Sequence, residues 1–170
     1  MSRLQLFPHL GLHKASFSNR TLEGDVPVYV DPTRTLGAGS LRTVNAQLFL
    51  QPSAGGPLMP LNPATTFRTS DPRVTFFVHP VDVTVPGYAA GTSVTIVMRA
   101  WVGPDYSSST WFGESAPFTI SALGGINPQT GAIVPTPDLA GMMSFTLVPE
   151  PSTIVFGVLG AAALLYRRRK

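Results

Sequence analysis

The sequence predicts a mainly β protein: an antiparallel β-sandwich followed by a single hydrophobic helix at the C-terminus. Sixteen glycines and seventeen prolines are distributed between short apolar runs along the 170 residues, as turns are between strands. The apolar runs are rich in β-branched and aromatic side chains, which favour strands. No stretch before Pro151 keeps a helical period for ten residues without a glycine, a proline or a strand-like run.

Seven apolar runs bounded by turn residues are expected to form the strands of the sandwich. The longest run alternates with a period of two, which is typical of a strand with one buried face. After the sixth run, residues 124–137 are expected to form a long loop before the last strand returns. The expected strands are residues 26–30, 45–50, 74–78, 82–85, 93–102, 116–121 and 144–148.

One part of this pattern resembles a known fold. The pair Pro86-Gly87, the stretch Ala90-Gly91-Thr92-Ser93 and a strand that ends Phe118-Thr119-Ile120 resemble the last two strands of a fibronectin type III or immunoglobulin-like domain. The resemblance implies an immunoglobulin/fibronectin III-like β-sandwich. It carries no implication for function, since such folds serve many functions.

The chain divides into three parts. Residues 1–16 are expected to be irregular, and they hold no run of seven apolar residues such as a secretory signal peptide needs. We therefore expect either that the true start lies further upstream or that the chain is a truncated copy. Residues 17–148 form the predicted β-sandwich domain, and residues 149–170 form the C-terminal tail.

Charge and cysteine content exclude several classes of partner and site. The last four residues supply four of the twelve cationic side chains, so the rest of the chain holds eight against nine acidic ones. The eight are scattered singly, whereas a nucleic-acid surface needs clustered cations, so no nucleic-acid partner is expected. The absence of cysteine removes disulfides, thiolate zinc sites and cysteine nucleophiles.

The tail has the pattern of a membrane span. Pro149 and Pro151 lack amide donors, so the strand that ends at Val148 is not expected to continue. Ser152 is a good helix N-cap, and residues 154–166 carry no charge. A helix over about residues 153–169 is roughly 25 Å long, slightly less than the hydrocarbon core of roughly 30 Å.

The four terminal cations set the expected topology. They stay in the cytoplasm by the positive-inside rule, which places the body on the other side of the inner membrane. A buried C-terminal core helix is the less favoured alternative, because this run is apolar on all faces. The span is expected to involve Ile154, Phe156, Leu159, Leu164, Leu165 and Tyr166, and the topology cluster is Arg167, Arg168, Arg169 and Lys170.

The order of these features resembles the PEP-CTERM sorting signal of exported proteins of Gram-negative bacteria. The tripeptide Pro149-Glu150-Pro151 with its Ser152, the apolar span and the basic end carry the resemblance. It implies that an exosortase, an integral-membrane transpeptidase-like enzyme, recognises the tripeptide, cuts near it and passes the protein toward the cell surface or extracellular matrix. The β-rich body also resembles, more faintly, the bodies that accompany such signals.

No catalytic, metal or cofactor site is predicted, so the chain is not expected to be an enzyme. His9 and His13 are four residues apart, a spacing that suits a metal only on a helix, but Gly11 and Pro8 disfavour a helix there, so both are expected to be solvated. His79 follows an apolar run and is expected at a strand end. The sequence Asn19-Arg20-Thr21 has the N-glycosylation pattern, which is usually idle in a bacterium.

Four aromatic residues around one predicted hairpin loop give an alternative function. An exposed aromatic platform stacks on sugar rings, which would make the body a glycan-binding surface module with polysaccharide as partner. Burial in the core is the favoured interpretation, because aromatic residues dominate core energetics. A single-span anchored protein that no exosortase processes is the third interpretation. The four residues are Trp101, Tyr106, Trp111 and Phe112.

Overall fold

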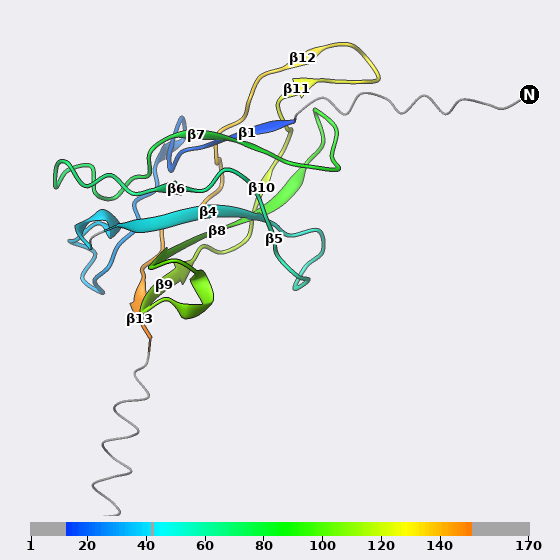
Figure 1. Cartoon of the computed structure of the whole chain (residues 1–170). Coiled ribbons are helices and arrows are strands. Elements are labelled where there is room, and N and C mark those ends of the chain that lie inside the picture. Colours follow the sequence, from blue (N-terminus) through cyan, green and yellow to red (C-terminus); the bar gives the residue numbers. More distant parts are fainter. Residues whose placement is uncertain (1–12, 42, 151–170) are drawn as a thin grey trace, which may run out of the picture.

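The main sheet is built around the run with the longest alternating pattern. A computed structural model describes residues 13–41 and 43–150 of the chain. In it β8 pairs antiparallel with β4 on one side and with β9 and β10 on the other, and β13 lies at the edge beside β9 (Figure 1). The seven strands of this sheet are β4 (Val44–Leu50), β5 (Met59–Pro60), β6 (Thr65–Thr66), β8 (Val94–Val102), β9 (Trp111–Glu114), β10 (Phe118–Ile120) and β13 (Val148–Pro149).

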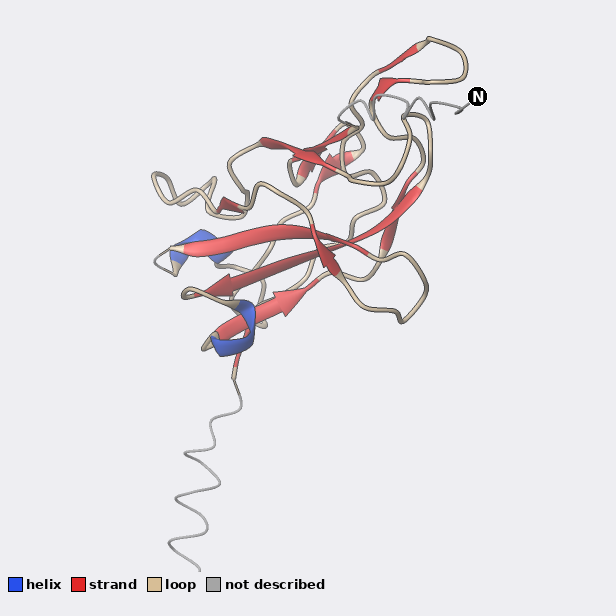
Figure 2. Cartoon of the chain, turned by 45° about the vertical axis from the view of Figure 1, so that its right-hand side comes forward, coloured by secondary structure: helices blue, strands red, loops and turns tan. Residues whose placement is uncertain are grey.

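Three two-stranded sheets complete the described part of the fold, which is almost free of helix (Figure 2). The ribbon of β1 and β7 shares one hydrophobic core with β4 and β8. The mainly β, antiparallel fold is therefore confirmed, while the immunoglobulin/fibronectin III-like kind of sandwich stays a prediction. The remaining strands are β1 (Lys14–Phe17) with β7 (Val81–Thr84), β2 (Arg20–Thr21) with β3 (Gly24–Asp25), and β11 (Gly125–Ile126) with β12 (Ile133–Val134).

The predicted alternation in the central strands is confirmed. Every second residue of β4 and of β8 points into the core and is buried, whereas the residues between them form the outer face of the sheet. On this outer face Val97 and Trp101 are also buried. The core-facing residues are Val44, Ala46, Leu48 and Leu50 of β4 and Val94, Ile96, Met98 and Ala100 of β8.

Three predicted strands are wrong in whole or in part. Residues 26–30 and 74–78 form no strand, and within 144–148 only Val148 belongs to one. Isolated bridges replace the ladders there: Tyr29 pairs with Gly37 and Thr146, and Val78 pairs with Phe67. Their apolar side chains pack as predicted, but their backbone groups find partners in turns and side chains rather than in a neighbouring strand.

Asn19 is the side chain that supplies several of these partners. It is 0% exposed. Its amide nitrogen donates to the carbonyl oxygens of Val26 (2.8 Å) and Phe76 (2.9 Å), and its amide oxygen accepts from the N–H of Val78 (2.9 Å). One side chain thus joins the segments 26–28 and 76–78, and its burial leaves the glycosylation pattern at 19–21 no accessible acceptor.

Two further expectations about the chain differ from the structure. The predicted loop 124–137 contains the hairpin of β11 and β12, because Asn127 closes its turn through hydrogen bonds to the amides of Gln129 and Thr130. β1 begins at Lys14, inside the segment 1–16 that was expected to be irregular, because β7 and Gly124 pair with it.

Helix in the described residues is limited to two short 3₁₀ turns, η1 (Ala38–Ser40) and η2 (Tyr106–Ser108). None of the helices within 13–41 and 43–150 is long and apolar enough to cross a membrane. The predicted span at about 153–169 lies outside the described residues.

Replacing Asn19 by alanine is expected to lower the free energy of unfolding by about 3 kcal/mol, because three buried backbone groups lose their partner. The half-buried turn residue Asn127, whose side-chain hydrogen bonds are open to solvent, is the control, and its replacement by alanine should cost less than about 1 kcal/mol. Urea unfolding of both variants measures the difference. Equal losses in the two variants would contradict the role assigned to Asn19.

Candidate functional site

The first residues of the predicted sorting signal lie on the edge of the main sheet. β13 pairs with β9 in the register Val148 to Phe112 and Pro149 to Trp111. The next residue continues this pairing, since the N–H of Glu150 donates to the carbonyl oxygen of Thr110 (2.9 Å). Pro149 and Glu150 are exposed. Their side chains are therefore accessible, while the backbone of this segment is hydrogen-bonded to the body.

Pro149 in a strand corrects the expectation that the last strand ends at Val148. A proline is tolerated in an edge strand where its missing N–H would face away from the neighbouring strand. β13 is such an edge, being the first strand in the order β13-β9-β8-β4-β5. The tripeptide thus begins within the folded body.

Leu147 anchors the chain directly before β13. Its side chain is 1% exposed and belongs to the core. Its N–H donates to the carbonyl oxygen of Tyr29 (2.8 Å), whose own N–H donates to the carbonyl oxygen of Phe145 (3.0 Å). Only one residue, Val148, separates this buried anchor from Pro149.

The Tyr29 segment is held by a turn that Asp31 organises. The Asp31 carboxylate accepts hydrogen bonds from the hydroxyl groups of Thr33 and Thr35 and from the amides of Thr35 and Leu36. The Thr33 hydroxyl is the largest cause that lowers the pKa of Asp31, and the Leu36 and Thr35 amides lower it further, so the pKa lies well below its usual range. Leu36 in turn accepts from the N–H of Val30 (3.0 Å).

Ser109 fixes the start of β9. Its hydroxyl oxygen accepts from the N–H groups of Val102 and Trp111, both at 3.1 Å, and its hydroxyl donates to the carbonyl oxygen of Trp111 (2.5 Å). A hydroxyl has one donor and two acceptor positions, so every position is used. Ser109 is buried. The start of β9 is therefore joined to Val102 of β8 through Ser109 as well as through the strand pairing.

Gly113 lets the incoming chain approach β9 closely. A Cβ atom at this position would lie 2.9 Å from the carbonyl oxygen of Thr146 and 3.2 Å from the Cα atom of Leu147. Real Cβ atoms essentially never lie within 3.0 Å of such a neighbour, and 3.2 Å is tighter than nine in ten real Cβ contacts. Glycine is thus required for the close contact between β9 and the segment before the signal.

The rest of the predicted sorting tail cannot be placed. Pro151, Ser152, the span residues between Ile154 and Tyr166, and the cations from Arg167 to Lys170 lie outside the described residues. The membrane span and its topology therefore stay predictions.

The structure brings three of the four candidate aromatic residues together. Tyr106 packs edge-on against Trp101 (ring centroids 6.0 Å apart) and against Phe112 (5.5 Å). Trp111 neighbours Phe112 in β9, so its side chain points to the opposite face, where it packs against the core. Trp101 is 7% exposed. The rings thus cover one another instead of forming an open platform.

Arg99 lies at the centre of this outer face. Its guanidinium stacks over Phe49 (5.0 Å to the ring centroid) and Tyr106 (4.4 Å), and its Nε donates to Glu114 Oε2 (2.9 Å). Burial raises the pKa of the Tyr106 hydroxyl, the Glu114 carboxylate raises it further, and Arg99 opposes them. The phenol is neutral at physiological pH, and its ring packs against Trp101, Phe112 and Arg99.

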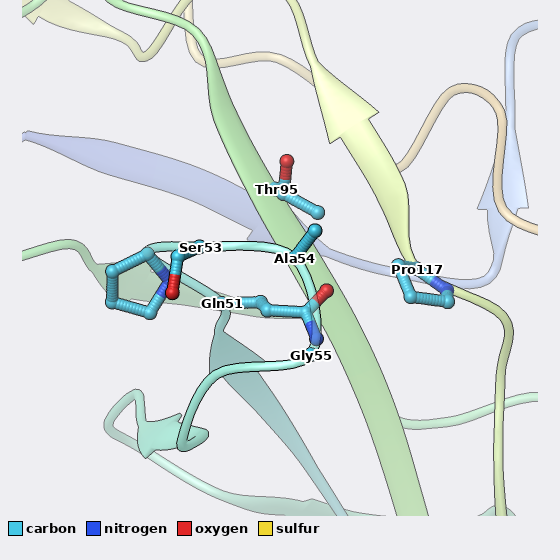
Figure 3. A pocket seen from close by; sticks show the side chains of 7 residues that line it. Gln51, Ser53, Ala54, Gly55, Thr95 and Pro117 are labelled. Atoms are coloured by element: carbon cyan, nitrogen blue, oxygen red, sulfur yellow. The ribbon is translucent and has the colours of Figure 1, made fainter.

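The described residues contain no group of three or more His, Asp or Glu side chains that could hold a metal. A surface hollow of about 470 Å³ lies between the turn 51–55, Thr95 of β8 and Pro117 (Figure 3), and no titratable side chain lines it. His79 is exposed, whereas His13, whose carbonyl oxygen accepts from the Val85 N–H (2.9 Å), is buried, so the expectation that His13 is solvated is wrong. His9 lies outside the described residues.

One comparison with known proteins supports the interpretation of the tail as a sorting signal. Residues 147–170 match a family model described as the PEP-CTERM protein-sorting motif, which confirms the resemblance seen in the sequence. The match begins at Leu147, the buried anchor of the signal. No curated protein and no solved structure matches the chain.

Sequence reasoning missed the residues that position the signal. The sequence predicts no role for Ser109 or Gly113. Neither has a local signature, because their roles depend on strands far away in the sequence. A proline two residues after a buried leucine is the one local hint that the signal follows the core without a linker.

Replacing Ser109 by alanine is expected to lower the free energy of unfolding by about 2 kcal/mol, because the amides of Val102 and Trp111 lose their acceptor. The exposed neighbour Ser108, replaced by alanine, is a matched control and should change it by less than about 0.5 kcal/mol. Chemical denaturation of the two variants gives the comparison. A loss in the Ser108 variant as large as in the Ser109 variant would be inconsistent with this assignment.

Asp31 is expected to make stability depend on acid pH. Because its pKa is lower in the folded than in the unfolded chain, its contribution is fully present above the unfolded value near 4 and is lost as the pH falls below it. The Asp31→Asn variant should therefore lose less stability than the wild type between pH 5 and pH 2. Thermal melting across this range measures it, and parallel curves for the two proteins would refute the effect.

Proposed function

We propose that the chain is a non-enzymatic surface or extracellular-matrix protein of a Gram-negative bacterium, sorted by an exosortase through Pro149, Glu150, Pro151 and Ser152. The observation that carries the proposal is the match of residues 147–170 to the PEP-CTERM protein-sorting motif. The structure is consistent with it, since Pro149 and Glu150, the last two residues that it describes, are exposed.

The reaction belongs to the partner enzyme. A peptide bond near the tripeptide is broken, the new carboxyl end of the body passes to an amine or to water, and the span leaves with a free amino group. Until then the span holds the protein in the inner membrane, with the cations from Arg167 to Lys170 in the cytoplasm and the body outside. Afterwards the body reaches the cell surface or the medium.

Two alternatives remain as proposals of lower rank. A glycan-binding module would need an open aromatic face, and the burial of Trp101 and the inward direction of Trp111 argue against the original platform. If the chain is a single-span anchored protein that is not processed, no exosortase recognises the tripeptide. The experiment below separates this alternative from sorting.

The test is the intact mass of the full chain expressed from its native locus, with and without the host's exosortase. A mature form that ends between Pro149 and Ser152 should appear only when the enzyme is present. The double variant Pro149→Ala, Glu150→Ala should stay full-length, because the recognition element is lost.

The matched control is Glu23→Ala with Pro128→Ala, which removes the same residue types from exposed positions of the body. It should be processed like the wild type. A chain that ends at Lys170 in both strains would show that no exosortase processes the protein.

A further inference from the structure

The positions of the prolines determine which backbone groups of the signal can bond to β9. Hydrogen-bonded positions alternate along an antiparallel pair, and the Glu150 N–H bonds to Thr110. Pro149 therefore occupies a position whose N–H would point away from β9. Since prolines have no amide donor, Glu150 supplies the only N–H of the tripeptide Pro149-Glu150-Pro151. That single donor is already bonded to the body.

From this geometry we infer that β9 is a latch: it holds residues 148–150, and an exosortase acts only after this segment leaves the sheet. The inference rests on the proposed function. An enzyme that binds a peptide in extended form uses the backbone groups along the strand edge and pockets for the side chains. In the docked state one edge of residues 148–150 is occupied by β9, and Leu147 fixes the chain directly before it.

The contacts of the latch are few, so it opens readily. They consist of the two residue pairs of β13 and the Glu150 hydrogen bond. Interactions of this kind favour the docked form by roughly 5- to 100-fold in total. If opening precedes recognition, the rate of processing is reduced by the same factor.

A disulfide across the latch provides the decisive test. Val148 and Phe112 lie directly opposite each other, and residues paired in this way have Cα atoms about 5.5 Å apart, within the range of a disulfide. The chain has no other cysteine. The full-length double variant Val148→Cys, Phe112→Cys, oxidised with diamide, is incubated with exosortase-containing membranes, and cleavage is followed by mass.

The oxidised double variant should be cleaved at least tenfold more slowly than the same protein after reduction with dithiothreitol. The single variants Val148→Cys and Phe112→Cys are the matched controls, and neither should respond to the reagents. Equal rates before and after reduction would overturn the latch, since the enzyme would then accept the docked strand. If the wild type itself is not cleaved, the proposed function fails instead.

A second variant weakens the contact between β9 and the incoming chain instead of locking it. Gly113→Ala places a methyl group 2.9 Å from the Thr146 carbonyl oxygen and pushes the incoming chain away from β9. Cleavage should become severalfold faster, and the Glu150 amide should exchange its hydrogen faster. The exposed residue Thr119, replaced by alanine, is the control and should change neither rate. Unaltered or slower cleavage in a folded Gly113→Ala protein with faster exchange would contradict the inference.

Discussion

The buried amide of Asn19 is the interaction on which the arrangement of the signal depends. It joins the backbone at Val26 to the backbone at Phe76 and Val78. The same segments then bond directly, since the Val28 N–H donates to Phe76. Residues 26–30 and 74–78 form no ladder, so their buried backbone groups need other partners, and one polar side chain at 0% exposure supplies three of them.

A series of contacts connects the segments that Asn19 holds to the residues of the sorting signal. The segment that begins at Val26 carries Tyr29, and Tyr29 bonds to both Phe145 and Leu147. Leu147 fixes the position of β13, and β9 receives it between the Ser109 hydroxyl network and Gly113. The positions of Pro149 and Glu150 are thus determined by contacts spread over much of the body.

The parts of this arrangement that sequence could predict are those with a local cause. The two-residue period over 93–102 predicted β8. The order of tripeptide, apolar run and terminal cations in the tail predicted the sorting motif. Residues 26–30 and 74–78 have strand composition, yet their hydrogen-bond partners are a side chain and turns. Composition reports that a segment is apolar and extended, but it does not identify the partner of its backbone.

The aromatic residues show the same limit. Trp111 and Phe112 are adjacent in sequence, so a strand sends them to opposite faces, and only the pairing of β9 with β8 decides which face is the core. Phe112 then joins Trp101 and Tyr106, while Trp111 stands opposite Pro149. A cluster that looked like one platform in sequence is divided between two surfaces.

The predicted junction between the body and the span is short in sequence. Glu150 is bonded to the sheet, and the predicted span begins at Thr153, three residues later. An extended segment of that length reaches about 10 Å. If the span forms as predicted, an enzyme that cuts in this interval works against the edge of the folded body. The more stable the pairing of β13 with β9 is, the less accessible the signal becomes, because the backbone groups that an enzyme would bind are the ones that pair with β9.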